Sequence, residues 1–113
     1  MTLIESFKFA IEGIINTTKN ERNLKIHFLA MICVFILGFL TNLNSIEWSI
    51  CIILISIIIS GELFNTAIEK ALDYAGEYHP LIKFAKDASA GAVLVLAIVS
   101  VVIGLIIFLP KLL

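Results

Sequence analysis

The sequence predicts an all-α membrane protein, with an N-terminal amphipathic surface helix and three transmembrane helices. Its composition is the first reason, because 60% of the 113 residues are hydrophobic and only 15% are charged, against about 45–50% and 25% in ordinary soluble domains. The second reason is a set of long uncharged runs, since a helix needs about 20 apolar residues to cross a bilayer. The length favours a single membrane-embedded domain over residues 1–113.

Residues 2–19 form the predicted surface helix. Polar side chains recur there at spacings of three and four, which places them on one helical face. They are Glu5, Lys8, Glu12, Asn16 and Lys19. Apolar side chains lie mostly on the other face, so the helix is expected to lie in the membrane surface. It could equally pack on the bundle of its own protein, and the two interpretations are compatible.

Three apolar segments follow, and they predict membrane spans over 26–43, 47–68 and 87–109. The middle segment is the most informative, because its uncharged run from Trp48 to Gly61 has only 14 residues. Such a run covers about 21 Å of helix, less than the roughly 30 Å of a hydrocarbon core. We therefore expect the middle helix to continue to about residue 74, with its first acidic residues at or within the membrane edge. A short re-entrant helix is the alternative.

The orientation follows from the distribution of Lys and Arg. Residues 1–25 hold four, the 41–47 turn none, the 69–87 connection three and the tail one. The positive-inside rule therefore places the N-terminus and the 69–87 connection in the cytoplasm. A net charge of −1 without a basic block argues against a nucleic-acid partner.

The middle helix carries a polar stripe, formed by Glu62, Asn65, Glu69 and Asp73. At 100° per residue these side chains fall within an arc of about 80°. A carboxylate at bilayer depth is costly, so such residues usually face a bundle interior and serve a function. Glu62 is the candidate proton acceptor, and a paired glutamate that only holds the bundle together is the alternative. Asp73 could also be a solvated helix end.

Two further clusters could meet this stripe. Glu21 precedes the first span, where an ion pair with Lys25 is the simpler interpretation. Lys86 and Asp87 precede the third span, where Asp87 could simply cap the helix. A magnesium ion prefers two or three carboxylates with water and phosphate oxygens, which would require Glu21 to approach Glu69. His79, beside a proline, is more typical of a surface turn than of a ligand.

The strings GELFNTAIEKALD, EYH and AKDASAGAVL resemble the prokaryotic diacylglycerol kinase family, which includes the undecaprenol kinases. The family pattern E-x-x-N-[ST]-A-I-E-x-x-x-D, a short connection and A-K-D are matched in order, and the similarity covers essentially the whole chain. The resemblance implies a homotrimeric helical bundle in the bacterial cell membrane. It also implies transfer of the γ-phosphoryl group of ATP, with Mg²⁺, to the hydroxyl of a membrane lipid, at a cytoplasmic site.

The resemblance also assigns residues on the lipid side of the site. Glu62 corresponds to the general base that contacts the lipid alcohol, and Asn65 to its catalytic neighbour. Ala90 occupies a substrate-contacting position where the family often has serine, and Ser89 stands one position earlier.

On the nucleotide side, the family motifs match five positions. Glu21 and Glu69 correspond to carboxylates that bind the metal and the nucleotide. Lys86 and Asp87 correspond to the nucleotide-binding pair, and Glu77 lies where the connection approaches the nucleotide.

The function expected from these features is a lipid kinase that converts undecaprenol to undecaprenyl phosphate. The chain is rich in Ile, Lys and Asn, as are many proteins of low-GC Gram-positive bacteria, whose members of the family are commonly undecaprenol kinases. A diacylglycerol kinase that makes phosphatidic acid is the alternative within the family. A small proton-coupled transporter or channel subunit, or a non-catalytic membrane interaction protein, belongs to another class. Glu62 lies near one end of its span rather than at the midplane, which argues against proton transport.

Overall fold

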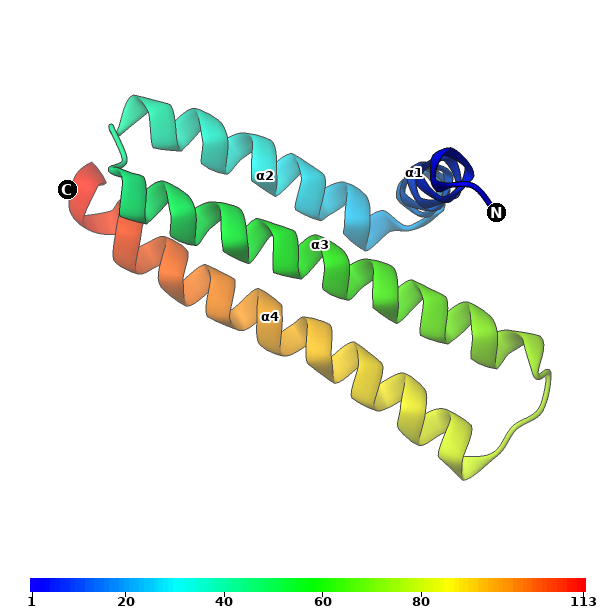
Figure 1. Ribbon diagram of the computed structural model, residues 1–113. Helices are drawn as coiled ribbons and strands as arrows, with labels where there is room; N and C mark the ends of the chain where they lie inside the picture. The colour runs from blue at the N-terminus through cyan, green and yellow to red at the C-terminus, as the bar shows by residue number, and fades with distance from the viewer.

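The computed structural model describes all 113 residues as four helices without a strand. The helices are α1 (Leu3–Asn20), α2 (Arg22–Leu40), α3 (Ser45–Tyr74) and α4 (Pro80–Leu112). Helices α2, α3 and α4 lie side by side, whereas α1 crosses the bundle and is seen nearly end-on (Figure 1). By length and composition, α2, α3 and α4 could each cross a membrane. The predicted all-α membrane class is confirmed.

Helix α1 begins with a capping box, in which Thr2 and Glu5 exchange side-chain to backbone hydrogen bonds of 3.1 Å. Helix α1 ends at Asn20. Glu21, whose backbone is extended, is the single residue that separates α1 from α2. None of the residues of α1 is buried. A helix with an exposed apolar face, set across a membrane bundle, has the arrangement expected of the surface helix.

Helix α4 begins seven residues before the predicted third span. The ring of His79 accepts a hydrogen bond from the Leu81 N–H, and Pro80 occupies the first helical position, which is a favourable way to start a helix. Asp87 therefore lies inside α4, and the interpretation of Asp87 as a helix cap is wrong. The predicted 69–87 connection shrinks to residues 75–79, where Gly76 has a φ of +68° that suits glycine.

Helix α2 also differs from the predicted segment, since it begins at Arg22 and ends at Leu40. Asn42, with a φ of 56°, turns the chain, and Asn44 caps α3 through a capping box with Glu47. Helix α3 then runs without interruption to Tyr74, as the sequence predicted. The limits of the membrane-spanning parts within these longer helices stay predictions.

Helices α3 and α4 are longer than a bilayer needs. Their 30 and 33 residues correspond to about 45 and 50 Å of helix, against a hydrocarbon core of roughly 30 Å. Their shared end around the 75–79 turn extends past α1 (Figure 1). The bundle can therefore cross the membrane and still carry a polar end in water.

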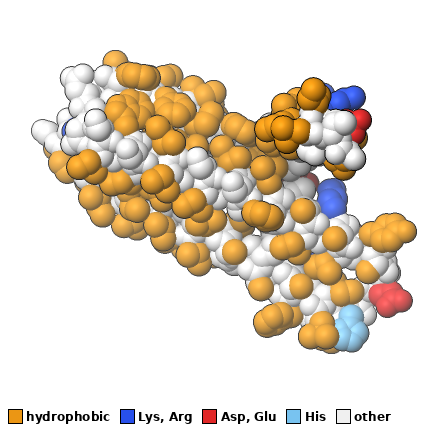
Figure 2. Space-filling model, viewed as in Figure 1, with side chains coloured by type: hydrophobic (Ala, Val, Ile, Leu, Met, Phe, Trp, Pro, Cys, Tyr) orange, Lys and Arg blue, Asp and Glu red, His pale blue; other side chains and the backbone are white.

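The opposite end of the bundle holds the small apolar core. Leu43, Cys51, Ile107 and Phe108 form a buried cluster, against which Trp48 packs. Only 9 of the 113 residues are buried, and apolar side chains are spread over the whole visible face of the bundle (Figure 2). Such a surface suits contact with lipid or with other membrane helices.

Candidate functional site

The buried carboxylate of Glu62 lies where α3 faces α2. Its side chain is 7% exposed, and its Oε1 lies 3.1 Å from Nε2 of His27, which is 21% exposed. The other carboxylate oxygen makes no hydrogen bond. His27 is the one His, Lys, Arg, Asp or Glu residue between Lys25 and Glu47, but periodicity along one helix does not show which helix faces it.

One turn further along α3, Asn65 connects α3 with α4. Its Oδ1 accepts a hydrogen bond of 2.7 Å from the Ser89 hydroxyl, and its Nδ2 donates one of 3.2 Å to Oε1 of Glu69. Asn65 is buried, and both of its amide atoms are satisfied. Ala90 is exposed and takes no part in this chain of hydrogen bonds. The hydroxyl that contacts Asn65 therefore belongs to Ser89, one position before residue 90, where the family often has serine.

Glu21 lies beside α3 at nearly the same level. Its Oε1 is 4.0 Å from Nζ of Lys70, the residue that follows Glu69. The ion pair with Lys25 that local sequence suggested is not formed. Glu21 thus contacts α3 through Lys70, whereas the carboxylate of Glu69 is hydrogen-bonded to Asn65.

A polar cavity of about 450 Å³ opens between the projecting ends of α3 and α4. Its lining consists of Leu72, Asp73, Gly76, Glu77, Tyr78, Ile82, Lys83, Lys86 and Asp87. Lys86 binds Asp73 across the two helices, and Lys83 binds Asp87 within α4, each at 2.5 Å. Three residues that the family motif assigns to the nucleotide, Glu77, Lys86 and Asp87, therefore line one cavity.

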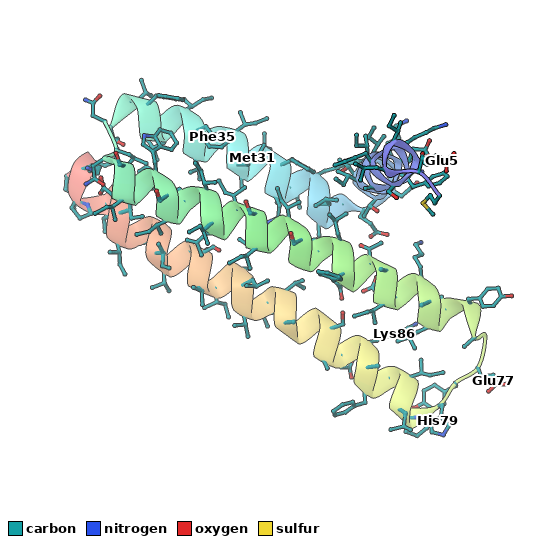
Figure 3. The ribbon with its side chains drawn as sticks, in the orientation of Figure 1. Glu5, Met31, Phe35, Glu77, His79 and Lys86 are labelled. Carbon is teal, nitrogen blue, oxygen red and sulfur yellow. The ribbon has the colours of Figure 1, made fainter.

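The orientation of these side chains differs within the cavity. Lys86 points between α3 and α4, whereas Glu77 and His79 lie at the turn, towards the outside (Figure 3). Asp73, whose role the sequence left open, is the partner of Lys86. The ammonium groups of Lys83 and Lys86 can exchange their partners, because a phosphate can replace an exposed carboxylate next to an ammonium.

No group of three His, Cys, Asp or Glu side chains that could hold a metal ion exists in the structure. Magnesium in nucleotide sites is usually bound by one or two carboxylates together with phosphates and waters. Glu21, beside Lys70, and Glu69, hydrogen-bonded to Asn65, are the two carboxylates that the family motif assigns to the metal. Two carboxylates would be enough for a magnesium ion whose remaining ligands are phosphate oxygens of the nucleotide and water.

Together these features define a helical membrane protein with polar side chains that run along α3 from the buried Glu62 to the cavity between the ends of α3 and α4. The family model for prokaryotic diacylglycerol kinases matches residues 8–108. The chain belongs to this family, as its motifs predicted.

Individual relatives agree with this membership. The chain is 51% identical to an undecaprenol kinase of Bacillus subtilis (strain 168) over 109 residues, which cover 96% of this chain and 89% of that protein. It is 35% identical to a diacylglycerol kinase of Synechocystis over 113 residues, covering 98% and 65% of the two chains. A diacylglycerol kinase of Haemophilus influenzae is also 35% identical, over 94% of this chain and 92% of its own. The names match the predicted enzyme class and both acceptors that the sequence suggested.

Proposed function

We propose that the protein is an ATP- and Mg²⁺-dependent lipid kinase that phosphorylates the hydroxyl of undecaprenol. The observation that carries this proposal is the polar path along α3. It starts at the buried carboxylate of Glu62, continues through Asn65 and Glu69, and reaches the cationic cavity around Lys86. A lipid alcohol approaches such a path from the membrane, and a nucleotide approaches it from water.

Glu62 acts on the lipid side as the general base. The hydroxyl of a membrane lipid cannot leave the interface, so its base must lie at that depth. The free oxygen of Glu62 takes the hydroxyl proton while the lipid oxygen attacks the γ-phosphorus. The bond between that phosphorus and the bridging oxygen of ADP then breaks. A positioned base of this kind contributes about 10²- to 10⁴-fold to the rate.

Lys86 and Lys83 act on the nucleotide side, where their ammonium groups neutralise phosphate charge. Phosphoryl transfer needs mainly positioning and charge neutralisation, so these groups can serve without a P-loop. Magnesium held by Glu21 and Glu69 would supply further neutralisation of the β- and γ-phosphate oxygens. Asn65 holds Glu69 in place through its amide hydrogen bond.

The proposal includes a membrane orientation and an assembly. The N-terminus and the 75–79 turn face the cytoplasm of a bacterial cell, which supplies ATP and magnesium. This is supported by the distribution of Lys and Arg along the chain. The exposed apolar faces of the bundle are consistent with the homotrimer that the family resemblance implied.

Undecaprenol is preferred over diacylglycerol because the relative with 51% identity is named an undecaprenol kinase, whereas the relatives named diacylglycerol kinases share 35–39%. The test is transfer of radiolabelled γ-phosphate from Mg-ATP by the purified protein to each lipid, in matched detergent micelles. We expect faster turnover on undecaprenol. Equal or faster turnover on diacylglycerol would overturn the preference, and no transfer to any lipid alcohol would overturn the kinase.

The metal role of Glu69 has its own test. Glu69→Gln removes a charged ligand but keeps the size of the side chain, so a higher magnesium concentration should be needed for half-maximal rate, together with a lower maximal rate. Glu12→Gln, at an exposed position of α1, is the matched control and should leave the magnesium titration unchanged. An unaltered titration in Glu69→Gln would show that this carboxylate is not a metal ligand.

A further inference from the structure

The carboxylate of Glu62 is held in the structure by one side chain only. Nε2 of His27, on α2, is its sole hydrogen-bond partner, at 3.1 Å. The lysines on the same part of α3 and on α4 do not pair with Glu62. Lys70 pairs with Glu21, and Lys86 pairs with Asp73. Neither Lys nor Arg contacts Glu62, so the orientation of this carboxylate depends on the imidazole.

The chemistry of the pair fixes the direction of the hydrogen bond. An ionised carboxylate only accepts hydrogen bonds, and an imidazole nitrogen donates only when it carries a proton. For Glu62 to be ready to take a proton, Nε2 of His27 must therefore be the donor and Oε1 the acceptor. The second carboxylate oxygen is then left without a partner, and it is the one that can receive a proton from a substrate.

The surroundings of His27 strengthen this contact. On the membrane side the ring lines a cavity of about 360 Å³ between α2, α3 and α4, and 14 of the 17 lining residues are hydrophobic. Met31, one turn further along α2, lines the same cavity and is marked in Figure 3. Hydrogen bonds are stronger where the local dielectric is low, so a single donor is sufficient to hold the carboxylate.

We propose that His27 is a positioning residue for the lipid kinase reaction, which directs the free oxygen of Glu62 towards the acceptor hydroxyl. This inference rests on the proposed function of Glu62 as the base. During the reaction the proton moves from the lipid hydroxyl to the free oxygen of Glu62. His27 keeps its own proton and its hydrogen bond to Oε1 throughout.

The test compares two substitutions of His27 with one control, using phosphate transfer from Mg-ATP to undecaprenol. His27→Leu removes the donor, and His27→Gln replaces it with an amide N–H of similar reach. Met31→Leu alters the same face of α2 and the same cavity without touching Glu62. We expect kcat to fall roughly 10- to 100-fold in His27→Leu, the range for a lost hydrogen bond to a charged group. The KM for Mg-ATP should stay within about twofold.

His27→Gln should recover most of the lost kcat, and Met31→Leu should match the unaltered protein. Wild-type kcat in His27→Leu would overturn the inference, as would equal losses in the Leu and Gln variants. If His27→Leu does not fold, His27→Asn takes its place, because its shorter amide cannot reach Glu62. Equal kcat in the Asn and Gln variants would then overturn the inference.

The same assay separates this inference from the proposed function. Normal kcat in His27→Leu together with an inactive Glu62→Gln would contradict only the positioning role. Full activity in Glu62→Gln would contradict the role of Glu62 as base, and with it the positioning role of His27.

Discussion

Removing the hydroxyl of Ser89 should disturb the site although this residue carries no charge and touches neither a metal nor a nucleotide in our account. Ser89 donates a hydrogen bond of 2.7 Å to Oδ1 of the buried Asn65, whose Nδ2 donates in turn to Glu69. Ser89→Ala leaves Oδ1 without a partner inside the bundle. It also frees the amide to turn, so that the amide no longer holds the carboxylate of Glu69.

The size of the effect follows from the burial of Asn65, which is 8% exposed. Leaving a buried acceptor unpaired costs about 1–3 kcal/mol. If the substitution destabilises only the arrangement of Asn65 and Glu69 that is active in catalysis, kcat/KM should drop by roughly 5- to 150-fold. If the cost falls on the folded state, the free energy of unfolding should decrease by the same amount.

Ser100 provides a matched control on the same helix. Its Oγ is buried and has no hydrogen-bond partner, so Ser100→Ala removes an unpaired polar atom with the same chemical change. This substitution should leave kcat/KM unchanged and either preserve or raise the thermal unfolding midpoint.

The assay measures kcat/KM for phosphate transfer and the thermal unfolding midpoint of both variants in one detergent. Ser89→Ala should lower kcat/KM, the unfolding midpoint or both. Ser100→Ala should lower neither. Indistinguishable behaviour of the two variants would refute the reasoning that Ser89, through Asn65, supports the site.

Two further substitutions test the bundle and the cavity. Gly38→Ala would place a Cβ 2.6 Å from Cη2 of Trp48, so overpacking should lower the free energy of unfolding by about 1–3 kcal/mol. Unfolding can be followed by the fluorescence of Trp48, the only tryptophan. Gly104→Ala, with nothing within 4 Å of its Cβ, should not destabilise, and equal midpoints would contradict the close contact at Gly38. Lys86→Gln should raise the KM for ATP with little change in unfolding midpoint, since its ion pair with Asp73 is more than a third exposed; a lower midpoint with normal KM would assign Lys86 to stability instead.

Much of the fold follows directly from the sequence. Uncharged runs and a lack of helix breakers are local properties, so they predicted the helices and the continuation of α3 to Tyr74. The sequence predicted the span over 87–109 but not the helix that precedes it, because His79 and Pro80, which start α4, lie in a polar stretch. A charged residue before an apolar run therefore does not mark the end of a helix.

The site was predictable as a set of residues on one helix and not as a set of contacts. Helical periodicity places Glu62, Asn65 and Glu69 on one face of α3 but does not specify the rotation of α2 and α4 about their own axes. That rotation brings His27 to Glu62 and Ser89 to Asn65. A histidine inside an otherwise uncharged run was the available signal for the first contact. The local sequence showed the hydroxyl of Ser89 one position before Ala90, but it did not indicate that this hydroxyl bonds Asn65.

The role of Glu62 as the base for a lipid hydroxyl at the membrane interface is best tested with Glu62→Gln. The substitution keeps the shape of the side chain and can keep a contact with His27, but the amide cannot take up a proton. The decisive measurement is the rate of radiolabelled phosphate transfer from Mg-ATP to undecaprenol, made on protein whose oligomeric state has been checked by size-exclusion chromatography. We expect a loss of at least 10²-fold in kcat with the assembly intact. Unchanged turnover would contradict the role of Glu62 as the base, and dispersal of the assembly would instead give Glu62 a structural role.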